Sequence, residues 1–146
     1  MTQTARYHHG DLHATLLQEA NTLLNEQGIE GLSLRKLAER AGVSRTAPYH
    51  HFRDKNALLC ALATQAFRQL DEMINSQLQE AGSQEGIQNF VREYLRFATE
   101  NPEQYELMFG RTIWKGGEPT DELKTIAYRS FRHYACLLYT SPSPRD

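Results

Sequence analysis

The segment from Gly31 to Leu59, GLSLRKLAERAGVSRTAPYHHFRDKNALL, constrains the fold of this chain more than any other. Two short helix patterns lie on either side of a turn that contains Gly42. The first pattern repeats apolar residues at helical spacing. The second carries hydroxyl groups, an arginine, a tyrosine and two histidines, with almost no aliphatic side chain. Because a short helix with that surface adds little to a core, the segment is typical of a helix-turn-helix.

Local signals set the boundaries of these two helices. Ser33 and Ser44 are N-cap residues for the first and the second helix. Gly42 supplies the positive φ that the turn requires, and Val43 is expected to pack into the core. Pro48 falls inside the second helix, over Ser44 to His51, where proline removes a hydrogen bond; we expect a distortion there rather than a break. The inward residues of the first helix are Leu34, Leu37, Ala38 and Ala41.

Helices also flank this segment. One begins near Asp11, a good N-cap, and Gly28 is expected to end it. These first three helices are expected to form a small N-terminal domain, called the head below, and Phe52 is the expected apolar residue that closes its core. Asp54 can cap a helix over 55–80 that is too long for a three-helix head and therefore runs into a second helical domain.

The rest of the chain predicts more helices and no strands. Residues 81–86, AGSQEG, are expected to form a loop, followed by a helix over 87–100. Asn101-Pro102 is an N-cap followed by proline at the first helical position, which predicts a short helix. Gly and Pro residues over 116–119 predict a loop, and a last helix is expected over about 120–135. The sequence therefore predicts an all-α protein.

Composition excludes several classes of protein. The chain has 146 residues, of which 40% are hydrophobic and 23% charged, so bulk disorder is not expected. No apolar run is as long as a membrane span and the N-terminal segment lacks the apolar stretch of a signal peptide, which predicts a cytoplasmic protein without membrane contact. Cys60 and Cys136 are expected to be free thiols.

The net charge of −2 hides a basic segment. Between Ser33 and Asn56 the acidic residues are Glu39 and Asp54. The basic residues of the same stretch are Arg35, Lys36, Arg40, Arg45, Arg53 and Lys55. A basic segment on an acidic body suits DNA binding at one end of the molecule, and a solvated charged face is the alternative.

The last residues, 136–146, read CLLYTSPSPRD, where the helical pattern gives way to alternating Ser and Pro. This peptide matches the translation of a transposon-type sequencing adapter, so we predict an artefactual tail and a natural chain that continues differently inside the last helix. A disordered terminus and a chance match are the alternatives.

The motif GLSLRKLAERAGVSRTAPYHHFRDKNALL, with its flanking helices, resembles the tetracycline-repressor (TetR) family of bacterial transcription regulators over about Asp11 to Leu62. The opening YHHGDL, the form SRTAPYHHF and the segment NPEQYELMFG are similar to a subgroup with its own C-terminal domain type. The resemblance implies a cytoplasmic homodimer with a DNA-binding head over 1–54 and a partial ligand-binding and dimerisation domain over 55–135. By the same resemblance, we expect the helices that usually build the family's dimer interface to be missing from the given sequence.

For the head, the expected function is binding to a double-stranded DNA operator. Arg45 and Thr46 lie in the first turn of the second helix, where a base contact, a phosphate contact and plain exposure all stay open. The resemblance implies contacts from Tyr49 and His50, and a phosphate contact from Lys55 at a helix N-terminus. The full predicted set is Ser33, Ser44, Arg45, Thr46, Ala47, Tyr49, His50 and Lys55.

For the second domain, the resemblance implies a pocket for a small-molecule effector that releases DNA from a repressor. The candidate lining residues, which are equally interpretable as core, are Phe67, Phe90, Tyr94, Phe97, Tyr105, Met108, Phe109 and Trp114. A helical binding module without DNA binding is the alternative function.

Enzymatic and metal chemistry find little support in the sequence. Neither a nucleophile motif nor a Gly-rich phosphate loop is present, and Glu103, Glu106 and Tyr105 form no recognisable acid/base pair. His8, His9 and His13 fit no structural zinc spacing. We therefore predict no enzyme, no cofactor and no metal. Arg6, on the N-terminal arm, is either a minor-groove contact or part of a disordered tail.

Overall fold

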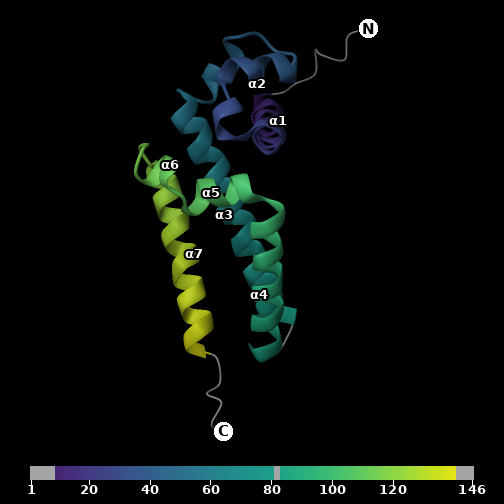
Figure 1. Cartoon of the computed structure of the whole chain (residues 1–146), viewed down its shortest axis with the longest axis vertical. Coiled ribbons are helices and arrows are strands. Elements are labelled where there is room, and N and C mark those ends of the chain that lie inside the picture. The colour runs from purple at the N-terminus through teal and green to yellow at the C-terminus, as the bar shows by residue number, and fades with distance from the viewer. Residues whose placement is uncertain (1–8, 81–82, 141–146) are drawn as a thin grey trace.

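The computed structural model describes residues 9–80 and 83–140, and within them the chain is helical without strands. The elements in chain order are α1 (His9–Gly31), α2 (Leu34–Ala41), the 3₁₀ helix η2 (Ala47–His50), α3 (Lys55–Glu80), α4 (Ser83–Glu100), α5 (Pro102–Phe109), α6 (Arg111–Trp114) and α7 (Asp121–Thr140). Figure 1 shows α1 and α2 at one end, and α3 running from this head into the bundle that contains α4 and α7. The predicted all-α class is confirmed.

One continuous core joins the two ends of the molecule. Leu16 and Leu24 of α1 are fully buried in the head, and Phe52 is buried as the expected anchor. The long helix α3 contributes to the same core along most of its length. Its buried apolar residues are Leu58, Leu59, Leu62, Ala66, Phe67, Leu70 and Ile74. Because one apolar stripe serves both halves, α3 sets how the head is held on the bundle.

Polar contacts at two levels fasten α3 to its neighbours. Near the head, Asn21 of α1 accepts a hydrogen bond from Gln104 of α5 at 3.1 Å and donates one to Gln65 of α3 at 3.0 Å. Further along, Asp71 is 3% exposed. Its carboxylate accepts hydrogen bonds from Ser130 Oγ at 2.7 Å and Arg129 Nε at 3.3 Å, which joins α3 to α7.

The second helix of the helix-turn-helix is wound more tightly than predicted. An α-helix over Ser44 to His51 was the wrong expectation: the chain forms a turn and then the 3₁₀ helix η2. The amides of Ala47, Tyr49 and His51 each bond to the carbonyl three residues earlier, at 3.0–3.1 Å. Pro48 has no N–H to donate to Ser44, which explains why the α pattern does not form. The expected distortion at Pro48 therefore takes the form of 3₁₀ winding.

Three other boundaries differ from the prediction. The loop expected over 81–86 is helical from Ser83, where Glu85 in the first turn favours the helix dipole. The single turn α6 was missed because four residues are too few to show a period. Helix α7 continues past the predicted end at Ala135 to Thr140, and residues 141–146 lie outside the described part of the chain.

Two of the predicted N-caps, Ser33 and Asp54, form their side-chain hydrogen bonds, whereas Asn101 precedes α5 without a capping bond from its side chain. Ser33 Oγ accepts a hydrogen bond from Lys36 N at 3.1 Å, and Asp54 Oδ1 accepts one from Ala57 N at 2.8 Å. Gly28 has a φ of 73° and interrupts α1, although one helical turn follows it. Asp11 lies inside α1, which already begins at His9.

No helix in the described ranges is both long and apolar enough to cross a membrane. The same residues hold no group of three or more side chains that could bind a metal ion. Arg6 and His8, which the sequence raised as a groove contact and a metal ligand, lie outside these ranges. Neither Cys60, which is buried, nor Cys136, which is exposed, forms a disulfide bond.

Gly42 gives a direct test of the turn. Its φ is 68°, and an added Cβ would meet no atom within 4 Å, so only backbone strain opposes a larger residue. Gly42→Ala is expected to lower the free energy of unfolding by about 1 kcal/mol. Gly42→Asn, which tolerates left-handed backbone better, is the control and should lose less. Denaturant midpoints followed by circular dichroism measure both; equal stability of wild type and Gly42→Ala would contradict the assigned turn.

Candidate nucleic-acid interface

The turn between α2 and η2 is built by backbone geometry around Gly42. Ser33 begins α2 by accepting from the amide of Lys36, and Gly42 ends it with left-handed backbone. The amide of Val43 then bonds to Ala38 O at 3.1 Å, and Val43 packs against the core as expected. This reversal places the segment 44–50 across the end of the head, next to the N-terminus of α3.

The 3₁₀ winding sorts the side chains of this segment into inward and outward rows. In a 3₁₀ helix, residues three apart lie on the same side. Pro48 is buried and His51, three residues on, is half-buried with its ring centroid 5.4 Å from that of His13. Tyr49 is 56% exposed, so it is not the half-buried aromatic that it would be in an ordinary core. The outward row therefore carries polar groups, with Pro48 as the inward anchor.

The structure places the other predicted contact residues around the same end. Ser44, Arg45, Thr46 and His50 are outward-facing, and Ala47 is half-exposed. The Oγ of Ser44 lies 3.3 Å from Thr46 Oγ1 rather than capping a helix. The side chain of Ser33 caps α2, so among the predicted DNA contacts it is the one with the least support.

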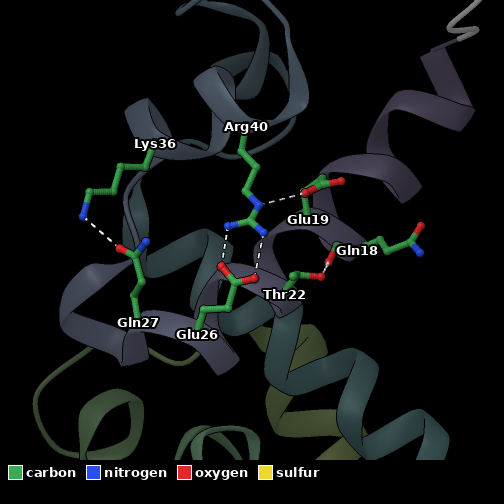
Figure 2. Close-up of polar contacts among 7 residues, drawn as sticks. All are labelled: Gln18, Glu19, Thr22, Glu26, Gln27, Lys36 and Arg40. Carbon is green, nitrogen blue, oxygen red and sulfur yellow. Dashed lines mark hydrogen bonds and ion pairs between the residues drawn. The ribbon is translucent and has the colours of Figure 1, made fainter.

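The basic residues of the head divide into paired and unpaired groups. Figure 2 shows Arg40 of α2 held by Glu26 and Glu19 of α1, with Arg40 Nη1 2.5 Å from Glu26 Oε2 and Arg40 Nε 3.3 Å from Glu19 Oε2. Lys36 Nζ donates to Gln27 Oε1 at 3.1 Å in the same view. Arg35 Nε lies 3.5 Å from Glu39 Oε1. Arg40 and Arg35 are thus paired with carboxylates within the head, whereas Lys36 is hydrogen-bonded to a neutral amide and keeps its positive charge.

Arg45, Arg53 and Lys55 make no hydrogen bond or ion pair through their side chains with any described residue. Arg45 and Arg53 are exposed, and Lys55 is half-exposed in the first turn of α3. The N-terminus of a helix favours a phosphate through its amide groups and dipole. Unneutralised positive charge therefore gathers beside Tyr49 and η2. Arg53 was counted in the basic segment but not predicted as a contact; its place beside the Asp54 cap was the available signal.

The second domain contains a pocket of about 430 Å³ between α3, α4, α5, α6 and α7. The predicted candidates that line it are Phe67, Tyr94, Met108, Phe109 and Trp114. Ala127, Phe131 and Tyr134 of α7 line it as well and were not predicted, although their spacing marks one face of that helix.

The remaining pocket candidates lie around this cavity rather than in it. Phe90 lines a neighbouring space of about 130 Å³ together with Tyr94 and Tyr134. The hydroxyl of Tyr105 lies 3.5 Å from that of Tyr94. Phe97 packs against the core and contributes to neither space.

The polar atoms of the pocket are neutral at ordinary pH. Burial is the largest cause that raises the pKa of both Tyr94 and Tyr134 well above the usual 10.0. Both phenols therefore stay protonated and act as hydrogen-bond donors. Trp114 Nε1 already donates to Met108 O at 2.8 Å.

A helix-turn-helix head on a helical bundle with a pocket between its helices defines a class of bacterial regulatory proteins, and comparison with known proteins agrees. The family described as "Bacterial regulatory proteins, tetR family" matches residues 16–62. The class A tetracycline repressor protein from transposon 1721 of Escherichia coli is 59% identical over 49 residues, which are 34% of this chain and 23% of that protein. The HTH-type transcriptional repressor AcnR of Corynebacterium glutamicum is 33% identical over 93 residues, which are 64% of this chain and 43% of that protein.

Two solved structures match over most of the chain. The TetR family transcriptional regulator PfmR from Thermus thermophilus is 30% identical with a TM-score of 0.65, over 85% of this chain and 68% of that one. A protein of unknown function from a Rhodococcus species is 33% identical with a TM-score of 0.78, over 92% of this chain and 70% of that one. The chain belongs to the TetR family. It spans less than half the length of the curated relatives described above.

The Arg40 contacts predict a pH dependence of stability. The hydrogen bond from Arg40 is the largest cause that lowers the pKa of Glu26 below its ordinary value of 4.5. A carboxylate with a lowered pKa in the folded state stabilises the fold above its unfolded pKa and loses this contribution as pH falls through the folded pKa. Arg40→Ala should therefore be less stable than wild type at neutral pH, and the difference should shrink in acid.

Urea midpoints of wild type and Arg40→Ala at a series of pH values measure this effect. Arg35→Ala, which removes a more exposed pair within α2, is the matched control and should change stability less at every pH. A stability difference for Arg40→Ala that stays constant from pH 7 into acid would show that Glu26 is not its partner in solution.

Proposed function

We propose that this chain is a sequence-specific DNA-binding transcriptional regulator of the bacterial cytoplasm, and that it acts as a repressor. The observation that carries the proposal is the group of unpaired cations, Arg45, Arg53 and Lys55, beside an exposed Tyr49 on a helix-turn-helix. Repressors among the relatives support it, since the tetracycline repressor and AcnR are both similar to a part of this chain, and the family model matches residues 16–62.

In the proposed complex the segment 44–50 enters the major groove of a double-stranded operator. Arg45 and Thr46 reach base edges first, because they precede η2 on its exposed side. Ala47 offers a methyl group to thymine. Tyr49 and His50 contact the backbone, and Ser33 and Ser44 supply hydroxyl groups at the rim of the same surface.

Lys55 and Arg53 contact phosphate on the flank of the groove. Lys55 combines its ammonium group with the N-terminal dipole of α3, which is 26 residues long. Phosphate contacts fix the position of the head on the duplex without carrying sequence information. The two kinds of contact together explain why one small head needs both exposed hydroxyl groups and unpaired cations.

The complete protein is proposed to work as a homodimer, with a DNA-binding head over 1–54 and a ligand-binding and dimerisation domain from 55 onward. Two heads about one DNA turn apart contact two half-sites. A small molecule in the pocket shifts the dimer toward a state with a different head spacing, because it binds that state more tightly. The continuous α3 is the element that reaches from the pocket to the head.

The cationic surface is tested by the salt dependence of binding to a generic DNA duplex, which needs no knowledge of the operator. Lys55→Ala should reduce the slope of log affinity against log salt by about 0.9, because one phosphate contact is lost. Tyr49→Ala should weaken binding roughly fivefold, the value of about one hydrogen bond. Fluorescence anisotropy on a labelled duplex measures both.

Arg92→Ala is the control, since Arg92 is an exposed cation in the middle of α4, which lies in the bundle and not in the head (Figure 1). Its slope and affinity should equal those of wild type. Unchanged binding by Lys55→Ala and Tyr49→Ala would reject the assigned surface. A wild-type chain that binds no duplex at low salt would favour a helical binding module without DNA binding.

A further inference from the structure

The pocket of the second domain has a lining that restricts what it can hold. Its walls are aromatic or aliphatic, and no charged side chain lines it among the described residues. Phe67 and Phe109 meet edge to face with ring centroids 5.4 Å apart at one wall. Phe131 at another wall is 67% exposed, which leaves the pocket open to solvent on that side. Flat apolar walls favour an aromatic ligand, and the volume of about 430 Å³ lies in the range of small-molecule sites.

One buried polar atom of the lining has no partner. Trp114 Nε1 is bonded to Met108 O, and the Tyr94 hydroxyl faces that of Tyr105. The Tyr134 hydroxyl is buried and makes no hydrogen bond with the described residues. Tyr134 lines both the main pocket and the smaller space beside it. A buried hydroxyl without a partner is unfavourable, so a ligand that accepts a hydrogen bond from this hydroxyl binds more tightly than one that does not.

The lining disfavours ions of either sign because none of its side chains in the described part of the chain carries a charge. An ion that leaves water for such an apolar site loses its hydration and meets no opposite charge. The carboxylate of Asp71 already accepts hydrogen bonds from Ser130 Oγ at 2.7 Å and Arg129 Nε at 3.3 Å, so it is bound by α7 and does not serve a cationic ligand.

We infer that the pocket binds an uncharged aromatic molecule that carries one hydrogen-bond acceptor, and that the Tyr134 hydroxyl donates to this acceptor. The inference rests on the proposed regulatory function, for which it names the chemical class of the effector. The aromatic walls favour a ligand with flat rings, and the Tyr134 hydroxyl favours a ligand that carries a hydrogen-bond acceptor.

Four probes of similar shape test the class. Benzophenone has a carbonyl acceptor between two rings, diphenylmethane has none, diphenylacetate is an anion and (diphenylmethyl)ammonium is a cation. The wild-type chain should bind benzophenone about three- to tenfold more tightly than diphenylmethane, the gain expected from one hydrogen bond, and should bind both ions more weakly than benzophenone. Trp114 is the single tryptophan of the chain and lines the pocket, so its fluorescence reports binding.

Tyr134→Phe isolates the hydroxyl. In this variant the preference for benzophenone over diphenylmethane should disappear, while diphenylmethane binds as it does to wild type. Without ligand, Tyr134→Phe should unfold at a temperature no lower than wild type, because it removes an unpaired buried group. Tyr128→Phe, an exposed tyrosine on the same helix, is the control and should keep both the preference and the unfolding temperature.

Equal binding of benzophenone and diphenylmethane by the wild-type chain, tighter binding of diphenylacetate, or a preference that survives in Tyr134→Phe would each overturn the inference. DNA binding is measured separately on the same samples. A chain that prefers benzophenone through Tyr134 but binds no duplex supports this ligand class and overturns the regulatory function. A chain that binds DNA and shows no preference for benzophenone overturns the ligand class alone.

Discussion

The structure depends on a single uninterrupted helix, α3, that belongs to both halves of the molecule. It packs against α1 of the head and against α4, α5, α6 and α7 of the bundle. Its apolar stripe forms one core from Leu58 to Ile74, and Asp71, near the far end of that stripe, fastens it to α7. The bundle and the head therefore share one helix and one core.

The N-terminus of α3 is also where the head exposes its unneutralised charge. On the α1–α2 side of the head the charge of Arg40 is neutralised within the protein, because Arg40 forms ion pairs with Glu19 and Glu26. Lys55 at the start of α3 and Arg45 before η2 make no such pairs with described residues. A net charge of −2 is therefore compatible with a cationic surface, because the distribution of charge and not its sum decides what the head attracts.

Local signals in the sequence predicted most of the fold. Ser33 as a cap and Gly42 as the positive-φ residue were predictable because each acts through its own backbone neighbours. The 3₁₀ winding at Pro48 was predicted only as a distortion, since its form depends on Pro48 being buried against the head. Phe131 and Tyr134 were missed as pocket residues because the sequence does not say which neighbour each face of α7 meets. The helical period identifies which face of a helix is apolar, but it does not determine which other helix packs against that face.

We propose that DNA meets the surface formed by η2 and the N-terminus of α3. This is tested by the amide chemical shifts of the isotope-labelled chain during titration with a short duplex. We expect the largest shifts at Arg45, Tyr49, Arg53 and Lys55, with little change along the acidic side of α1. Largest shifts on the bundle, or none at η2 when the duplex is bound, would contradict it.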